Sequence, residues 1–257
     1  MKKKLIVLLF LLMISIFLLS CTVTDRICVE GRKVQVAGNV VGIKCENDNE
    51  WKEEKNTKTI NTSAQNIGII TCIDKETNQY IAFCHAISSN SKIVDIKGNK
   101  CYRANYLGID KASNNKVGKL IAVSNTSLEI GSVLENTETG VLGQISDESI
   151  FNEEETEEFY IGSKYSIERG PAKLYVNLDG NGLKQYDIQI DSINYFNNTK
   201  NIHAKIIDEE LINKTGGIIK GMSGSPIIQN GKLIGAINCV SEENPTDAYG
   251  IFADNLF

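Results

Sequence analysis

Short β-type segments, separated by turn residues, run through most of this chain and limit its fold class. They occupy residues 66–73, 79–84, 117–123, 140–145, 160–167, 172–176 and 185–195. Turns such as Leu178-Asp179-Gly180-Asn181-Gly182 separate them, and helix signal is scarce. The best helix candidate is Asp208 to Lys214, closed by Gly216-Gly217. Strands at this spacing predict an antiparallel barrel or sandwich.

One serine near the C-terminus lies in a sequence suited to nucleophilic chemistry. It is Ser223, in the run Gly221-Met222-Ser223-Gly224-Ser225-Pro226. Small residues let the backbone turn sharply and present the hydroxyl, and the amides of Gly221 and Ser223 are the natural donors of an oxyanion hole. The segments 227–228 and 232–240 predict a hairpin that carries the serine. The alternative is a Gly/Ser-rich turn that only joins two strands.

The chain has two histidines, so candidates for a general base are few. His85 ends the apolar run that begins at Tyr80, which predicts a ring that projects from a strand end into a cleft. His203 follows the polar loop 197–201, which predicts an exposed ring. We therefore expect His85 to act as the general base for Ser223. A core histidine held by hydrogen bonds is the simpler alternative.

Three carboxylates are candidates for the group that orients the histidine. Asp208 precedes Glu209-Glu210-Leu211 and is also a good helix N-cap, a role that explains it without catalysis. Asp95 and Asp110 follow His85 in the first half of the chain, where a two-barrel protease usually has its acid. The residues alone leave the choice open.

The N-terminus predicts export. Lys2-Lys3-Lys4 precede an apolar stretch from Leu5 to Leu19, which is the order typical of a secretory signal. Leu18-Leu19-Ser20-Cys21 resembles a bacterial lipobox, so we expect Cys21 to be lipidated. An uncleaved membrane anchor is the alternative, although the stretch is shorter than the roughly 20 residues that a spanning helix prefers. Either way, we expect the rest of the chain outside the cytoplasm.

Composition narrows the function classes. A net charge of −5 without a basic stripe after Lys4 argues against nucleic acid as a partner. Seven cysteines occur, and the six besides Cys21 lack the paired spacing of a metal site. They predict either disulfides or small core residues. We expect no metal and no organic cofactor.

The chain divides into three parts. Residues 1–21 are the signal peptide or anchor, 22–65 a strand-rich segment followed by a polar linker that begins at Glu46, and 66–257 the main domain. The acidic cluster from Asn152 to Glu158 predicts a solvated loop.

The stretch from Lys214 to Ala236 closely resembles the SpoIVB family of sporulation serine peptidases. Its signature is Lys-Thr-Gly-Gly-Ile at 214–218, leading into Gly-Met-Ser-Gly-Ser-Pro at 221–226. Residues 248–252 resemble the family's closing strand, and 68–87 its histidine region, where Cys84 replaces the usual Gly. Residues 36–44 resemble the piece that precedes a PDZ domain in the family.

The resemblance implies roles and a fold. Ser223 is the nucleophile, His85 the base and Asp208 the third member, because the family's proposed acid lies in an Asp-x-Glu-Leu stretch at this distance before the serine. The fold implied is an all-β, chymotrypsin-like double β-barrel with its site in the cleft between barrels. The function implied is signalling proteolysis between the mother-cell and forespore membranes, on a membrane-bound sporulation regulator or assembly protein, with self-cleavage.

One departure supports a different reading. The segment between Lys44 and Asn66 is too short for the family's PDZ domain, so this chain resembles a catalytic domain without the module that is associated in the family with control of self-cleavage and binding of partners. With the altered Cys84, this supports the alternative of a non-catalytic, membrane-tethered scaffold that binds a sporulation protein. A lipoprotein that binds cell-wall sugar would need exposed aromatic residues, and the one Trp, Trp51, lies in a charged loop.

Overall fold

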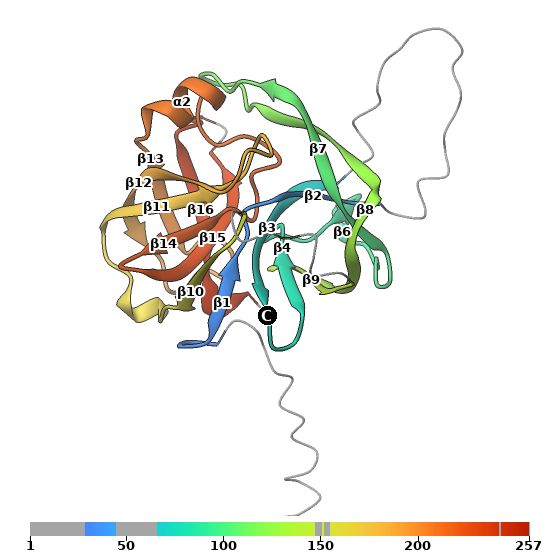
Figure 1. Ribbon diagram of the computed structural model, residues 1–257. Coiled ribbons are helices and arrows are strands. Elements are labelled where there is room, and N and C mark those ends of the chain that lie inside the picture. Colours follow the sequence, from blue (N-terminus) through green and yellow to red (C-terminus); the bar gives the residue numbers. More distant parts are fainter. Residues whose placement is uncertain (1–28, 45–65, 147–150, 152–154, 242, 257) are drawn as a thin grey trace, which may run out of the picture.

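The computed structural model describes residues 29–44, 66–146, 151, 155–241 and 243–256 (Figure 1). The predicted signal segment with Cys21, and the polar linker up to residue 65, lie outside these ranges. Within them, no helix is both long and apolar enough to span a bilayer.

The first of two closed barrels has six strands in the order β3-β2-β7-β8-β9-β4, and β4 pairs with β3 to close the ring. All of these pairings are antiparallel. Closure leaves no open strand edge in the ring. The strands are β2 (Val40–Ile43), β3 (Asn66–Asp74), β4 (Gln79–Ala82), β7 (Lys100–Asp110), β8 (Lys119–Thr137) and β9 (Gly140–Ile145).

The second barrel repeats the pattern with the order β14-β11-β12-β13-β16-β15, closed by the pairing of β14 with β15. That closing pair is the hairpin predicted after Ser223. The strands are β11 (Gly170–Val176), β12 (Lys184–Ile193), β13 (Ile202–Ile206), β14 (Pro226–Gln229), β15 (Lys232–Val240) and β16 (Asp247–Phe252).

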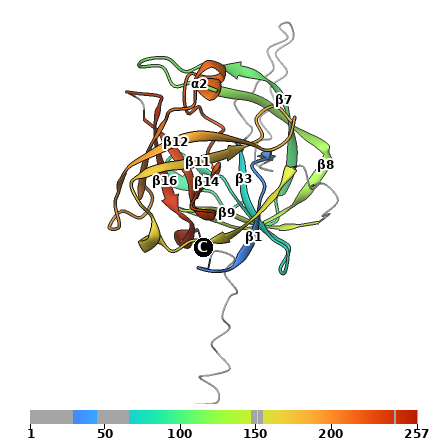
Figure 2. The same ribbon diagram turned by 60° about the vertical axis from the view of Figure 1, so that its left-hand side comes forward.

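Two further strands join the barrels. β1 (Lys33–Val36) pairs with β3 and with β10 (Glu157–Ile161), and β10 runs parallel to β15. Apolar side chains from both barrels pack together here, among them Ile81 and Leu233. Figures 1 and 2 show the two barrels side by side. The predicted all-β, chymotrypsin-like double barrel is confirmed.

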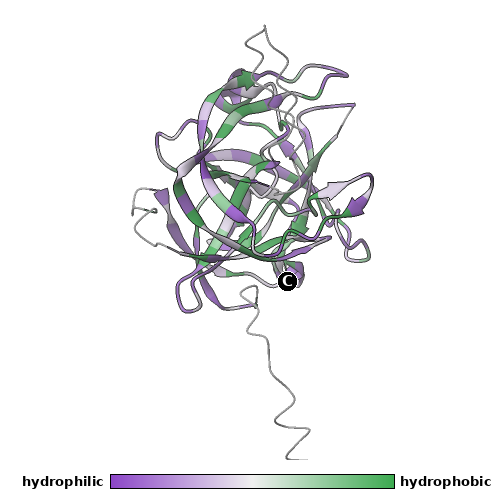
Figure 3. Ribbon diagram, turned by 90° about the vertical axis from the view of Figure 1, so that its right-hand side faces the viewer, coloured by the Kyte–Doolittle hydropathy of each residue, from purple (hydrophilic) through white to green (hydrophobic). Residues whose placement is uncertain are grey.

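The barrel cores follow from alternation along the strands. In β12, Tyr186, Ile188 and Ile190 are buried, whereas Gln185 and Asp187 are exposed. Successive side chains of a strand point to opposite faces, so one face fills the barrel and the other meets water. Figure 3 shows this alternation as hydrophobic and hydrophilic blocks along the ribbons.

The α-helix that the described residues contain is α2 (Glu209–Thr215), where the sequence predicts it. It ends at Gly216, which has a φ of 79° and needs the left-handed conformation that glycine adopts readily. Lys214 ties the helix to the β11–β12 turn, because its Nζ donates to Asp179 Oδ2 at 2.6 Å. Shorter elements are β5 (Ser88–Ser89), β6 (Lys92–Ile93) and the 3₁₀ turns η4 (Lys164–Ser166) and η5 (Ala253–Asn255).

One expectation about a polar segment needs correction, and one polar strand was missed. The acidic cluster is not solvated throughout, because Glu155 is 8% exposed and pairs with Arg103, while Glu157 and Glu158 belong to β10. The strand β7 was not predicted at all. Its sequence shows no clear apolar alternation, and backbone pairing with β2 and β8 holds it in place.

The cysteines that the structure describes carry free thiols. Cys72, Cys84 and Cys101 are buried, and Cys239 is half-buried. Of the two predictions for the cysteines, disulfides or small core residues, the second is therefore correct for these four.

The pair of Lys214 and Asp179 predicts a pH-dependent contribution to stability. Burial alone would raise the pKa of Asp179, but hydrogen bonds from Lys214 and Asn181 outweigh it and hold the pKa below 3.8. A carboxyl whose pKa is lowered by folding stabilises the fold above its unfolded pKa, and this contribution is lost as the pH falls through the folded pKa. We expect Asp179→Asn to lower the free energy of unfolding by about 1 kcal/mol at neutral pH, after allowance for solvent screening. Urea denaturation should show that this difference from the wild type shrinks toward zero in strong acid. An equal difference at both pH values would contradict it.

Candidate active site

Ser223 lies in a tight turn fixed by its neighbours. Met222 is buried in the core of the second barrel, and Ser225 Oγ donates to the Met222 carbonyl at 2.7 Å. Gly224 has a φ of 99°, and a Cβ at this position would lie 2.2 Å from the carbonyl oxygen of Ile69. Only glycine fits there. Ser223 itself is half-buried between these fixed residues.

The amides of this turn divide into bonded and free groups. Those of Met222, Gly224 and Ser225 each donate to a backbone carbonyl. Those of Gly221 and Ser223 donate to no group in the part of the chain that the structure describes. Both residues are half-buried. Two free amides beside a serine hydroxyl are what an oxyanion hole requires.

Backbone hydrogen bonds join this turn to the segment of His85. The Ser223 carbonyl accepts from the Ile69 amide of β3 at 2.9 Å, and the Ile69 carbonyl accepts from the Phe83 amide at 3.0 Å. Phe83 lies two residues before His85. The serine of the second barrel and the histidine of the first are therefore attached to the same residue of β3.

Two buried side chains strengthen this attachment. Thr71 Oγ1 donates to the Gly224 carbonyl at 2.7 Å and accepts from the Cys84 thiol at 3.3 Å. Asn238 of β15 donates through Nδ2 to the Cys84 carbonyl. Sequence reasoning missed both residues. A polar residue inside the apolar run of β3 was the available signal for Thr71.

The backbone before His85 has an unusual conformation. Phe83 and Cys84 have φ values of 69° and 50°. This left-handed region is rare for residues with a side chain and natural for glycine, which fits the glycine that the SpoIVB family usually has at this position. Burial raises the pKa of the Cys84 thiol to about 12. Cys84 is therefore a packing residue and no second nucleophile.

The ring of His85 is oriented by its own chain. Its Nδ1 lies 3.0 Å from the carbonyl oxygen of Ala86, and since that oxygen can only accept, Nδ1 carries the proton. The lone pair is then on Nε2, where a general base needs it. No hydrogen bond joins His85 to Ser223 among the described residues, and such catalytic hydrogen bonds commonly form only when substrate binds.

Asn136 of β8 holds the loop that follows His85. Its Oδ1 accepts from the Ile87 amide at 3.0 Å, and its Nδ2 donates to the carbonyls of Ile87 and Val94, each at 2.8 Å. Nothing in the sequence around Asn136 indicated this role.

Asp208 is the N-cap residue of α2, the helix labelled in Figure 2. Its Oδ1 accepts from the Leu211 amide at 3.0 Å and its Oδ2 from the Asp187 amide at 3.1 Å. Both carboxylate oxygens thus bind backbone. The structure shows the capping role, and the catalytic role of Asp208 stays a prediction.

The other candidates also have local partners. Asp95 accepts from the Lys97 amide in an exposed turn, and Asp110 forms an ion pair with Lys116 at 2.8 Å. His203 lies on β13, half-buried, with its ring centroid 5.2 Å from that of Tyr249. None of these three side chains has a hydrogen bond or ion pair with His85 or Ser223 in the described ranges.

No group of three or more His, Cys, Asp or Glu side chains in the described ranges is placed to hold a metal ion. The expectation that no cofactor is needed stays a prediction.

A family model described as SpoIVB peptidase S55 matches residues 57–257. The chain belongs to this family. It is therefore a serine peptidase, and the family resemblance seen in the sequence is confirmed. A search of curated proteins found no match.

Solved structures similar to this SpoIVB-family peptidase are remote in sequence. The active form of the Rv3671c protease from M. tuberculosis has a TM-score of 0.43 and 11% identity, covering 86% of this chain and 78% of its own. The serine protease AL20 from an extremophilic microorganism has a TM-score of 0.43 and 8% identity, covering 89% and 96%. The inactivated protease paralogue S-D1 of the scabies mite has a TM-score of 0.44 and 12% identity, covering 88% and 92%. Similarity at this level carries no argument about activity.

Thr71→Val tests the attachment between the barrels. The variant leaves the Gly224 carbonyl without its donor, which should lower the free energy of unfolding by about 1–3 kcal/mol. We expect a fluorophosphonate probe to label Ser223 about tenfold more slowly in this variant, since the turn loses one of its fixed points. The control is Thr199→Val, in a surface loop. Equal labelling rates for Thr71→Val and the wild type would show that the attachment does not position Ser223.

Asp208→Asn separates the capping role from the catalytic one. Asparagine keeps the cap of α2 through its one amide oxygen, but its NH2 group cannot accept from the Asp187 amide, so we expect the melting temperature to fall only slightly. Because both oxygens of Asp208 bind backbone, we expect kcat/KM on a protein substrate to fall less than tenfold. A loss on the order of 10⁴, as expected when a triad acid becomes an amide, would instead support Asp208 as the third catalytic member.

Proposed function

We propose that this chain is a serine endopeptidase in which Ser223 is the nucleophile and His85 the general base. One observation carries the proposal. The amides of Gly221 and Ser223 are free, they flank a serine turn, and that turn is bonded through Ile69 to the segment of His85. Membership of the SpoIVB family supports the same conclusion.

The mechanism follows from these positions. His85 Nε2 removes the proton from Ser223 Oγ as the oxygen attacks the scissile carbonyl. The tetrahedral oxyanion accepts hydrogen bonds from the amides of Gly221 and Ser223, and removal of one such donor typically costs on the order of 10²–10³ in kcat. His85 then gives the proton to the leaving amine. A water molecule, activated by the same nitrogen, releases the acyl group from Ser223.

Orientation of the base has two possible sources. In the structure, the Ala86 carbonyl holds the Nδ1 proton of His85. By family resemblance, Asp208 supplies a carboxylate to this ring, which would stabilise the imidazolium more strongly than a neutral carbonyl does. The Asp208→Asn variant decides between the two.

For the biological role, we infer signalling proteolysis during endospore formation from the family alone. The enzyme would act outside the cytoplasm, in the space between mother-cell and forespore membranes, tethered by its N-terminal segment or by lipidated Cys21. Its substrate would be a membrane-bound sporulation regulator or assembly protein, with self-cleavage as a further event.

Ser223→Ala tests the activity directly. We expect the variant to fold like the wild type but to lose both casein cleavage and labelling by a fluorophosphonate, because no other residue replaces the hydroxyl. The matched control is Ser127→Ala, an exposed serine on β8. Retained proteolysis by a pure, folded Ser223→Ala protein would falsify the proposal.

The alternative is a membrane-tethered scaffold that binds a sporulation protein without cleaving it. Two observations favour it: Cys84 adopts a φ of 50° where the family usually has glycine, and no described carboxylate is hydrogen-bonded to His85. A scaffold should not react with the fluorophosphonate. A host that carries only the Ser223→Ala allele should then sporulate normally, whereas a peptidase predicts arrest at the stage at which the deletion arrests.

A further inference from the structure

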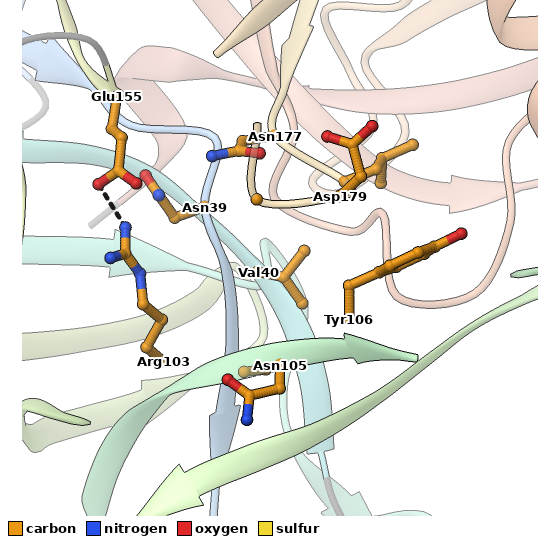
Figure 4. Close-up of a pocket in the computed structure, with 11 residues that line it drawn as sticks. Asn39, Val40, Arg103, Asn105, Tyr106, Glu155, Asn177 and Asp179 are labelled. Atoms are coloured by element: carbon orange, nitrogen blue, oxygen red, sulfur yellow. Dashed lines mark hydrogen bonds and ion pairs between the residues drawn. The ribbon is translucent and has the colours of Figure 1, made fainter. Parts of the chain in front are cut away.

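A polar pocket of about 360 Å³ contains charged side chains that bind within the protein (Figure 4). Glu155 pairs with Arg103 at one end, and Asp179 at the other end accepts from Lys214 at 2.6 Å. These charges are therefore compensated without a ligand. Aromatic rings at one end of the second barrel are in the opposite situation, because they face solvent.

Three aromatic side chains form this exposed patch. Tyr165 belongs to η4, and Tyr195 and Phe196 belong to the turn between β12 and β13. Phe196 is 98% exposed, Tyr165 77% and Tyr195 43%. The rings of Tyr165 and Tyr195 stack with their centroids 5.8 Å apart, and the Tyr195 ring lies 5.6 Å from that of the buried Phe252. Single exposed apolar side chains are ordinary, whereas a contiguous group of them typically marks an interaction surface.

Hydrogen bonds fix the turn that carries Phe196. Asn194 Oδ1 accepts from the Phe196 amide at 3.0 Å. The Asn194 amide donates to the Asn201 carbonyl at 2.7 Å, and Asn201 Nδ2 donates to the Asn194 carbonyl at 3.1 Å. Since Asn201 is only 1% exposed, these bonds attach the turn to the barrel. The exposure of Phe196 is therefore a built feature of the fold.

The first described residues of the chain lie beside this patch. The Gly31 amide donates to the Ile161 carbonyl at 2.8 Å, and the Ile161 amide donates to the Arg32 carbonyl at 2.9 Å. Tyr165 follows Ile161 by four residues, a reach of at most roughly 14 Å. Figure 1 shows the start of β1 and the yellow turn η4 at the same end of the molecule, away from α2.

The N-terminal segment expected to bind the membrane is also close by in sequence. Cys21, the expected lipidation site, comes eight residues before Val29, at which the described chain begins. Eight residues span at most roughly 29 Å when fully extended. A tether at the N-terminus therefore holds this end of the second barrel near the lipid surface.

We propose that Tyr165, Tyr195 and Phe196 dock this face of the protein on the lipid bilayer that holds its N-terminus. Phe196 contacts the acyl chains, and the two tyrosines lie among the headgroups, as rings with an apolar body and a polar tip do at membrane interfaces. The short tether favours lipid over a protein as the partner of these rings. The inference rests on the membrane tether of the proposed function and uses none of its catalytic residues.

The test places one tryptophan on the full chain, reconstituted in vesicles of phosphatidylcholine and phosphatidylglycerol. The chain's single tryptophan, Trp51, is replaced by Phe so that only the introduced indole reports. Phosphatidylcholine brominated in its acyl chains quenches an indole that enters the bilayer. We expect Phe196→Trp to lose at least about half of its fluorescence in the brominated vesicles. The matched control is Leu107→Trp, at a 50% exposed position on β7 of the first barrel, which should lose little.

A second comparison tests whether the aromatic rings cause the docking. With Tyr195→Trp as the reporter, the added changes Tyr165→Ser and Phe196→Ser should reduce quenching at least about twofold, because they remove the most exposed rings of the patch. The control pair, Tyr106→Ser with Leu107→Ser, removes exposed side chains of β7 and should leave the quenching unchanged. Both pairs should melt close to the temperature of the reporter protein, since they alter exposed positions.

Flotation of the vesicles separates the docking face from the tether. Full chain that floats with the vesicles without quenching of Phe196→Trp overturns the docking face alone, and so does equal quenching of Phe196→Trp and Leu107→Trp. Full chain that stays behind overturns the tether and the docking face together. A dimer of the detergent-solubilised chain that Tyr165→Ser with Phe196→Ser abolishes would assign the patch to a second copy and also overturn the proposal.

Discussion

The hydrogen bonds of Ile69 are the constraint on which the site depends. This residue of β3 donates to the carbonyl of Ser223 and accepts from the amide of Phe83. Each barrel closes separately, and other contacts also join them: the strands β1 and β10, side-chain packing, and backbone bonds such as that from the Leu120 amide to the Lys220 carbonyl at 2.8 Å. Ile69 binds the nucleophile's turn and the base's segment at one point, so the relative position of hydroxyl and imidazole is set by backbone.

This arrangement explains at which positions around the site only one kind of residue fits. Gly224 must be glycine because the carbonyl of Ile69 occupies the space of a Cβ. Thr71 must carry both a donor and an acceptor, because its hydroxyl donates to the Gly224 carbonyl and accepts from the Cys84 thiol. The free amides of Gly221 and Ser223 are then a consequence of the turn, since their neighbours are bonded elsewhere.

Sequence alone predicts the parts of the site that depend on local structure. The serine turn, its hairpin and the cap of α2 all have short-range signals in glycine, proline and aspartate, and the structure contains each of them. The parts that depend on tertiary contact had no such signal. Thr71, Asn136 and Asn238 act on groups far along the chain, and the polar strand β7 is defined by its partners. The third catalytic member stays open for the same reason, because an N-cap and a triad acid look alike in sequence.

A crystal structure of the wild-type protein with a phosphonate bound covalently to Ser223 tests the central claim most directly. The account predicts that the phosphoryl oxygen lies about 2.7–3.1 Å from the amide nitrogens of both Gly221 and Ser223, with the imidazole of His85 beside Oγ. A phosphoryl oxygen turned away from both amides, or a His85 ring that stays remote from the adduct, would contradict it.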